Sequence, residues 1–295
     1  MKKAMVITLA VLGLLSVAAL GVYVKYFCGY EIYRDLEYGE SERSKLDLYL
    51  PEEAYERETN GVVLFIHGGS WSGGDKSEEE LRCRLIASEG YIAAAMNYTL
   101  ARGEDREEYT VDTVLMEISE ALGAVVSYTA ELGITVDKAA TAGYSAGAHL
   151  SMLYSFSSRD TAPVEILFTA NMAGPADLTP EIWREEMAIR IGSLLSGKEI
   201  TAEMIDNGES EEILASVSPV FYVSENTPPT ILIYGVKDAL VTKENCESLV
   251  KKFESVGVPY DLFLLPDSDH SLLQNPIKHL KYYQKIIEYC KEYFA

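Results

Sequence analysis

The stretch AATAGYSAGAHL, residues 139–150, decides the fold that we predict for this chain. Its first residues are small and apolar, as in a buried strand, and residues 146–156 are compatible with a helix. Between them lies Gly143-Tyr144-Ser145-Ala146-Gly147. An abrupt turn from strand to helix projects its central side chain outward, and glycines two positions away on either side avoid a clash. The free N–H groups at the helix start would then lie beside the serine oxygen. The stretch predicts a nucleophilic serine, although Gly-x-Ser-x-Gly also occurs by chance.

The bulk composition favours one domain. The chain has 295 residues, of which 48% are hydrophobic, enough for one large core. It contains no internal repeat and no Pro/Gly/Ser-rich linker that would divide it. We therefore expect a single catalytic domain over residues 26–295.

An apolar run precedes this domain. Residues 4–24 carry no charge, which makes 21 residues, and Lys2, Lys3 and Lys25 flank them. About 20 apolar residues span a bilayer as a helix. Residues 1–25 are thus predicted to be a signal anchor or a cleaved signal peptide, with a buried helix as the third reading. Either export reading places the domain outside the cytoplasm, at the cell membrane or secreted.

Charge and cysteine content limit the partners. The net charge is −21, and it becomes −24 without the three lysines of residues 1–25. Such a charge argues against binding nucleic acid or anionic lipid surfaces. Four histidines without a ligand-like cluster argue against a metal site. The cysteines are scattered, so one disulfide stays open but a framework is not expected; they are Cys28, Cys83, Cys246 and Cys290.

Strands and helices are expected to alternate along most of the chain. Residues 29–38 and 46–50 alternate in polarity and predict an antiparallel pair at a sheet edge. Six apolar runs then predict buried strands, near residues 62–66, 91–97, 139–144, 166–172, 228–235 and 260–265. Helical patterns separate or follow them, at residues 77–89, 109–131, 146–156, 243–256 and 276–293. The order predicts an α/β fold with a mostly parallel eight-stranded sheet between helices. Residues 176–218 contain helical pieces (180–195 and 202–214) but no strand, so we expect an insertion that covers the active face.

Chemically useful residues follow several of these strands directly. In parallel sheets, sites form beyond the carboxyl ends of the strands, so Ser145, Asp238 and His270 should meet at one edge. A serine needs a base to take its proton, and the base needs an acid to orient it. We predict His270 as the base and Asp238 as the acid. Asp267 and Asp269 compete for the latter role, but both lie on the loop of the base itself.

A cradle for the oxyanion is expected beside the serine. The glycine-dense segment HGGSW, residues 67–71, follows a buried strand. Backbone N–H groups of Gly68 and Gly69, together with that of Ala146, are predicted to form the oxyanion hole. One such donor contributes roughly 3–4 kcal/mol in comparable enzymes. The aromatic side chains expected to line the substrate pocket are Trp71, Tyr98 and Tyr144.

Taken together, these motifs resemble the α/β-hydrolase superfamily, in the branch of feruloyl-esterase-like, kynurenine-formamidase-like and hormone-sensitive-lipase-like enzymes. The order Ser…Asp…His is that of α/β-hydrolases. The matching segments are residues 46–51 (LDLYLP), 67–71 (HGGSW), 74–76 (GDK), 96–98 (MNY), 143–150 (GYSAGAHL), 228–238 and His270.

The resemblance implies a serine esterase that uses a Ser-His-Asp triad and no cofactor, acting on a small-molecule ester. The same residues could cleave an amide, as in an arylformamidase or a small peptidase, and the motifs do not separate the two. A tethered binding protein on an inactive hydrolase fold is the alternative from another class.

Overall fold

The computed structural model describes residues 28–103 and 109–295. An eight-stranded sheet with the order β1-β2-β4-β3-β5-β6-β7-β8 forms its centre. The strands are β1 (Tyr30–Glu37), β2 (Lys45–Pro51), β3 (Asn60–Ile66), β4 (Ile92–Met96), β5 (Val136–Tyr144), β6 (Glu165–Met172), β7 (Thr230–Gly235) and β8 (Tyr260–Leu265). β1 pairs with β2 and β2 with β4 in antiparallel fashion, and the other pairs are parallel. The predicted edge hairpin and mostly parallel sheet are confirmed.

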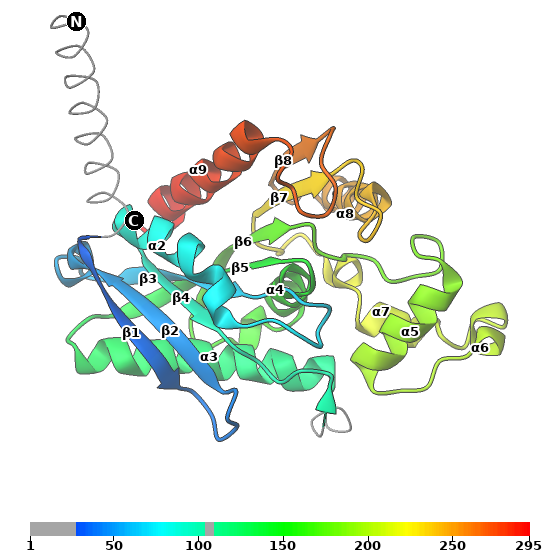
Figure 1. Ribbon diagram of the computed structural model, residues 1–295, viewed down its shortest axis with the longest axis horizontal. Helices are drawn as coiled ribbons and strands as arrows, with labels where there is room; N and C mark the ends of the chain where they lie inside the picture. Colours follow the sequence, from blue (N-terminus) through cyan, green and yellow to red (C-terminus); the bar gives the residue numbers. More distant parts are fainter. Residues whose placement is uncertain (1–27, 104–108) are drawn as a thin grey trace, which may run out of the picture.

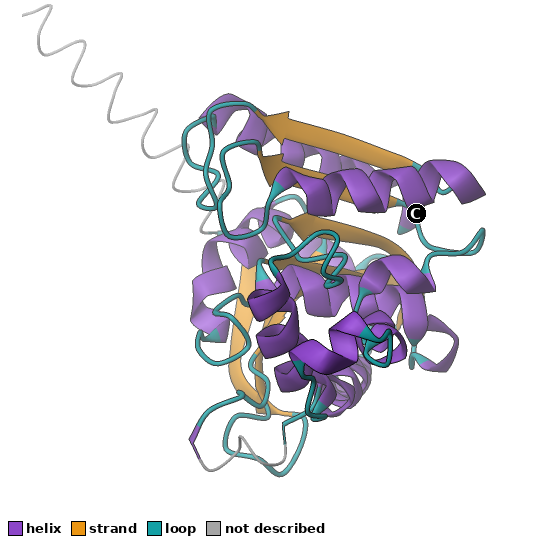
Figure 2. Cartoon of the chain, turned by 90° about the vertical axis from the view of Figure 1, so that its right-hand side faces the viewer, coloured by secondary structure: helices purple, strands orange, loops and turns teal. Residues whose placement is uncertain are grey.

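Helices cover both faces of the sheet (Figures 1 and 2). On one face lie α3 (Val111–Glu131), α4 (Ala146–Ser157) and α8 (Lys243–Val256); on the other lie α2 (Glu80–Ser88) and α9 (Pro276–Tyr293). The alternation of strand side chains explains the two layers. In β3, Val62 and Leu64 join the core under α3, whereas Val63 and Phe65 join the core under α2 and α9.

The insertion after β6 contains α5 (Glu185–Ser196), α6 (Ala202–Asp206) and α7 (Glu211–Ser216), and it ends in the 3₁₀ turn η5 (Pro219–Tyr222). Figure 1 shows these helices beyond the carboxyl ends of the parallel strands. The absence of a strand between residues 176 and 218, all of which are described, agrees with the prediction. The first insertion helix begins at Glu185 and not at residue 180, because residues 179–183 form a turn in which the N–H groups of Ile182 and Trp183 donate to the carbonyl of Thr179.

One helix is divided differently from its prediction. The helix predicted at residues 77–89 is divided into the 3₁₀ turn η2 (Lys76–Glu79) and α2. Asp75 caps η2, because its side chain accepts from the N–H of Ser77. The four cysteines are all free, and Cys28 alone among them is exposed.

The predicted apolar run at residues 4–24 lies outside the described residues. Within residues 28–103 and 109–295, no helix combines the length and the apolar character needed to cross a membrane.

Candidate active site

Ser145 occupies the turn between β5 and α4. Its backbone has φ +54° and ψ −120°, a conformation that L-residues rarely adopt. The turn is tight enough that a Cβ on Gly143 would collide with the backbone of Gly147, and a Cβ on Gly147 would collide with the carbonyl oxygen of Ile66. The N–H of Ser145 donates to the carbonyl of Met172 at 2.8 Å, which ties the turn to β6. The strained serine expected from the sequence is therefore present, and the two glycines permit it.

The side chains of Ser145, His270 and Asp238 form one hydrogen-bonded chain. His270 Nε2 lies 2.9 Å from Ser145 Oγ, and His270 Nδ1 lies 2.6 Å from Asp238 Oδ2. The carboxylate can only accept, so Nδ1 carries a proton and Nε2 presents its lone pair to the serine hydroxyl. The arrangement can remove a proton from Ser145 during attack on a carbonyl carbon.

Asp238 is held rigidly. Its side chain is fully buried, and its second oxygen, Oδ1, accepts from the N–H groups of Leu240 and Val241 at 2.8 and 2.9 Å. Both carboxylate oxygens thus have donors. The two competing acids have other partners: Asp267 pairs with Lys237, and Asp269 accepts from Ser271.

Tyr144 links the serine turn to the loop of the base. Its hydroxyl donates to the carbonyl oxygen of His270 at 2.8 Å, and the two rings lie 5.2 Å apart. Burial raises the pKa of Tyr144 to about 12, so the hydroxyl keeps its proton for this bond. Tyr144 therefore supports His270 in addition to lining the pocket, which the sequence alone did not suggest.

The glycine loop lies against the serine. A Cβ on Gly68 would be 2.9 Å from the carbonyl of Tyr144 and 3.5 Å from Ser145 Cβ, so only a glycine brings the backbone this close. Gly69 has φ +114°, and its carbonyl accepts from the N–H groups of Ser72 and Gly73 in a tight turn. Ala146 is the first residue of α4, where N–H groups lack intrahelical acceptors. Gly68 and Ala146 thus lie beside Ser145, and Gly69 lines the same cavity; their role as oxyanion donors stays a prediction.

Two other histidines are structural. Burial lowers the pKa values of His67 and His149 to about 4, so both rings are neutral near pH 7. His149 Nδ1 accepts from Trp71 Nε1 at 3.2 Å, while its Nε2 donates to the carbonyl of Val217 at 2.8 Å. This histidine joins the glycine loop to the end of the insertion.

A cavity of about 1240 Å³ opens over Ser145 and His270. Trp71 and Tyr144 line it as expected, but Tyr98 does not. Tyr98 is fully buried and stacks on His67 with ring centroids 4.4 Å apart, so its predicted pocket role is corrected. The sequence pattern after residue 96 placed Tyr98 beyond a strand end but could not tell which way its ring turns.

The insertion forms one wall of this cavity, which agrees with its expected place over the active face. Its lining residues include Trp183, Met187, Arg190, Ile191 and Leu194. Sequence reasoning did not single them out. The amphipathic pattern of residues 185–196 is the signal for all of them except Trp183, which precedes the helix, since side chains three and four positions apart share one helix face.

The fold and this arrangement define an α/β-hydrolase. The BD-FAE family model matches residues 46–253, more than two thirds of the chain, and the chain therefore belongs to this family of α/β-hydrolase esterases. Among known proteins, the chain is similar to isoprenylcysteine alpha-carbonyl methylesterase ICME of Arabidopsis thaliana, 23% identical over 294 residues that cover 90% of this chain and 63% of that protein. It is also similar to kynurenine formamidase of Danio rerio, 28% identical over 120 residues that cover 40% of this chain and 37% of that protein.

Solved structures agree on the fold. A truncated carbohydrate esterase from gut microbiota superposes with a TM-score of 0.72 at 16% identity, covering 90% of this chain and 96% of that one. The predicted membership of the α/β-hydrolase superfamily is confirmed. Three of the plant methylesterases match 86–90% of this chain, but the chain spans only 54–63% of the length of those proteins.

Proposed function

We propose that this protein is a serine hydrolase that cleaves a carboxylic ester through an acyl-enzyme intermediate. The observation that carries the proposal is the chain of hydrogen bonds from Ser145 through His270 to Asp238, at the floor of a large cavity. In the first step, Ser145 Oγ attacks the ester carbonyl while His270 Nε2 takes its proton. His270 then returns this proton to the departing alcohol, and the acyl group stays on the serine.

The second half of the reaction uses the same groups. A water molecule gives a proton to His270 and attacks the acyl carbon; the bond to Ser145 Oγ then breaks, His270 returns the proton to Oγ, and the carboxylic acid leaves. Asp238 keeps the proton on Nδ1 and stabilises the imidazolium that forms in both halves. The N–H groups of Gly68, Gly69 and Ala146 stabilise the negative oxygen of each tetrahedral intermediate. The reaction needs no cofactor.

Amide cleavage is the second candidate, and the similarity to a kynurenine formamidase supports it. The same triad serves both reactions, since the leaving group of an amide differs chiefly in needing protonation before it departs. We place ester cleavage first because the family and most of the similar proteins are esterases.

Nitrophenyl esters and aryl formamides, assayed side by side, test the choice. We expect ester hydrolysis by the full-length protein and its loss in Ser145→Ala. Strong formamide cleavage without ester cleavage would overturn the choice of substrate class. Labelling by a fluorophosphonate tests the mechanism itself: folded protein in which Ser145 stays unlabelled would support a non-catalytic binding protein and refute the enzyme.

We also propose that residues 26–295 form the catalytic domain and lie outside the cytoplasm. This proposal rests on the uncharged run at residues 4–24 and its flanking lysines. Fractionation and protease accessibility in intact cells test it; protection of the domain until the cells are lysed would contradict it. N-terminal sequencing of the mature protein separates an anchor from a cleaved signal peptide.

A further inference from the structure

Arg43 lies in the turn between β1 and β2 and reaches the glycine loop, although it does not line the cavity. Its Nε donates to the carbonyl of Tyr98 at 2.8 Å. Its terminal NH2 group donates to the carbonyl of Gly74 at 3.1 Å and lies 3.3 Å from His67 Nε2. One half-buried guanidinium thus bonds to the first residue of the glycine loop, to a residue just beyond its end, and to the segment that follows β4.

His67 carries this contact to the oxyanion loop. Its Nδ1 lies 2.7 Å from the carbonyl oxygen of Gly68, which can only accept, so Nδ1 bears the proton. Its Nε2 is then the acceptor for Arg43. The carbonyl of Gly68 and the N–H of Gly69 belong to one peptide group, and that N–H is one of the predicted oxyanion donors. This peptide group is therefore linked to Arg43 through the His67 ring.

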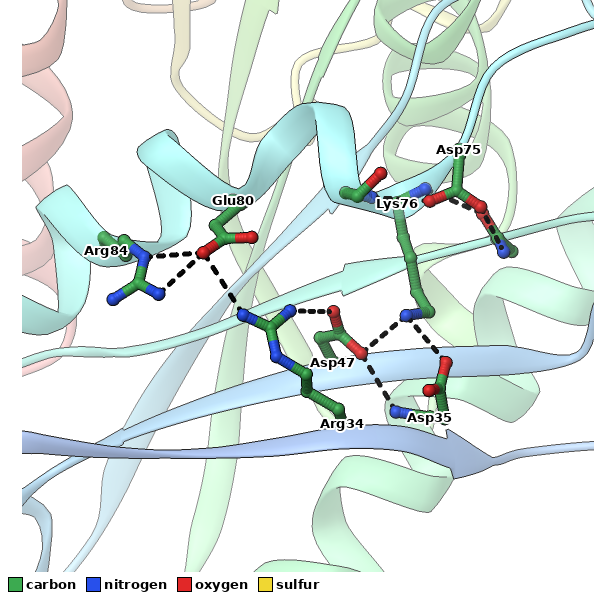
Figure 3. Close-up of polar contacts among 9 residues, drawn as sticks. Arg34, Asp35, Asp47, Asp75, Lys76, Glu80 and Arg84 are labelled. Atoms are coloured by element: carbon green, nitrogen blue, oxygen red, sulfur yellow. Dashed lines mark hydrogen bonds and ion pairs between the residues drawn. The ribbon is translucent and has the colours of Figure 1, made fainter.

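The same hairpin also holds Lys76, the first residue of the turn η2 that follows the loop. Lys76 Nζ pairs with Asp47 at 2.6 Å and with Asp35 at 2.9 Å, and the Asp47 and Lys76 side chains are only 1% and 9% exposed (Figure 3). The backbone N–H of Lys76 donates to Asn97 Oδ1 at 2.7 Å. The loop is therefore braced at both ends by residues of β1, β2 and the turn between them.

We propose that Arg43 is a positioning residue for ester hydrolysis, holding the peptide groups of Gly68 and Gly69 through His67 and Gly74 where they stabilise the oxyanion. The inference rests on the proposed function. Hydrogen-bond donors stabilise a developing negative charge only if they already lie where the charge forms. A small displacement of these donors lowers kcat more than it weakens substrate binding. Arg43 touches no substrate and acts only through the loop.

Two variants of the full chain test the inference. Arg43→Met keeps the length of the side chain and removes its donors. Arg57→Met is the matched control, because Arg57 also donates to a backbone carbonyl, that of Gly90, and covers the Tyr91 ring, but it lies before β3 and β4, at the end of these strands opposite to the loop. For Arg43→Met we expect kcat to fall about 10- to 100-fold with KM within about twofold. Arg43→Lys should recover part of kcat, because an ammonium can still reach one of the acceptors.

A boronic acid provides a second measure, since it adds to the serine as a tetrahedral anion. Its inhibition constant should rise with the loss of kcat in Arg43→Met and stay unchanged in Arg57→Met. A kcat within about threefold of wild type, in a folded Arg43→Met protein, would overturn the inference and leave the proposed function intact. An equal loss of kcat in Arg57→Met would also overturn it, because the effect would then be general destabilisation.

If no ester is cleaved by the wild type, the proposed function fails, and the contact itself is still testable. Selective ¹⁵N labelling of the four histidines reports the tautomer of His67 by NMR. We expect the Nδ1–H form in both proteins, because the Gly68 carbonyl holds that proton, and a shifted Nε2 resonance in Arg43→Met, because the Nε2 lone pair loses its donor. An unchanged Nε2 resonance in the variant would overturn the inference.

Discussion

Replacing Asp238 by asparagine tests the triad by exchanging one carboxylate oxygen for an NH2 group. Oδ1 of Asp238 accepts from two backbone N–H groups, those of Leu240 and Val241. In Asp238→Asn the amide oxygen must take this position, because an NH2 group there would face two donors. The NH2 group is then directed at His270 Nδ1, which has to become an acceptor, and the proton moves to Nε2. A protonated Nε2 cannot receive the proton of Ser145.

The expected effect is large and falls on kcat. In proteases with the same triad, loss of the correct tautomer costs about 10⁴-fold, so we expect a loss of about 10³- to 10⁴-fold, or roughly 4–5 kcal/mol of transition-state stabilisation. KM should change little, since the buried Asp238 does not line the cavity. The assay is steady-state hydrolysis of a nitrophenyl ester, with Asp267→Asn as the matched control and Ser145→Ala as the baseline. A loss of less than about tenfold in Asp238→Asn, or an equal loss in Asp267→Asn, would refute the assignment of the acid.

Three further predictions concern packing, the cavity wall and pH. Gly147→Ala should lower the free energy of unfolding by about 3 kcal/mol in urea titrations, because the new Cβ meets the carbonyl of Ile66. Gly123→Ala, in open space on α3, is the control and should be neutral or stabilising by up to about 1 kcal/mol. A greater loss of stability in Gly123→Ala than in Gly147→Ala would contradict the prediction. Leu194→Trp should reduce kcat/KM for a nitrophenyl octanoate at least tenfold relative to the acetate, because it fills the cavity from the insertion; parallel losses on both esters would speak against a wall at this position. Burial lowers the pKa of His149 from 6.5 to about 4, so as the pH falls this histidine is protonated in the unfolded chain before it is protonated in the folded one. The free energy of unfolding therefore decreases as the pH drops from 6.5 towards 4, by roughly 3 kcal/mol for His149. Urea unfolding between pH 7.5 and 4.5 measures the slope, and an equal slope in His149→Gln would exclude His149 as its source.

The regular elements were largely predictable because they depend on local pattern. The helices at residues 243–256 and 276–293 have the predicted bounds, and the strands after residue 60 lie where continuous apolar runs predict them. Misjudged ends lie where a local polar contact competes with the helix. Asp75 caps a 3₁₀ turn before α2, and the turn closed by Thr179 delays α5 to residue 185. Such contacts depend on side-chain orientation and leave little trace in periodicity.

The candidate site likewise has residues that the sequence predicted and side-chain orientations that it did not. Ser145, Asp238 and His270 could be named from the sequence alone, because each lies in the segment that follows a strand, and parallel strands bring their carboxyl ends to one edge. The direction in which a neighbouring ring turns was not accessible. Tyr98 packs beneath His67 and not in the cavity, since the space beside that ring exists only once the hairpin and the glycine loop have met.

By itself, the stretch at residues 139–150 determined the strained serine, because glycines at positions 143 and 147 and a strand running into a helix impose that turn locally. The tertiary structure decided what surrounds it: Tyr144 bonded to the carbonyl of His270, the wall supplied by α5, and Arg43 behind the glycine loop. These contacts join segments that are distant in the chain. Their geometry follows from how whole layers pack, which no local pattern of residues specifies.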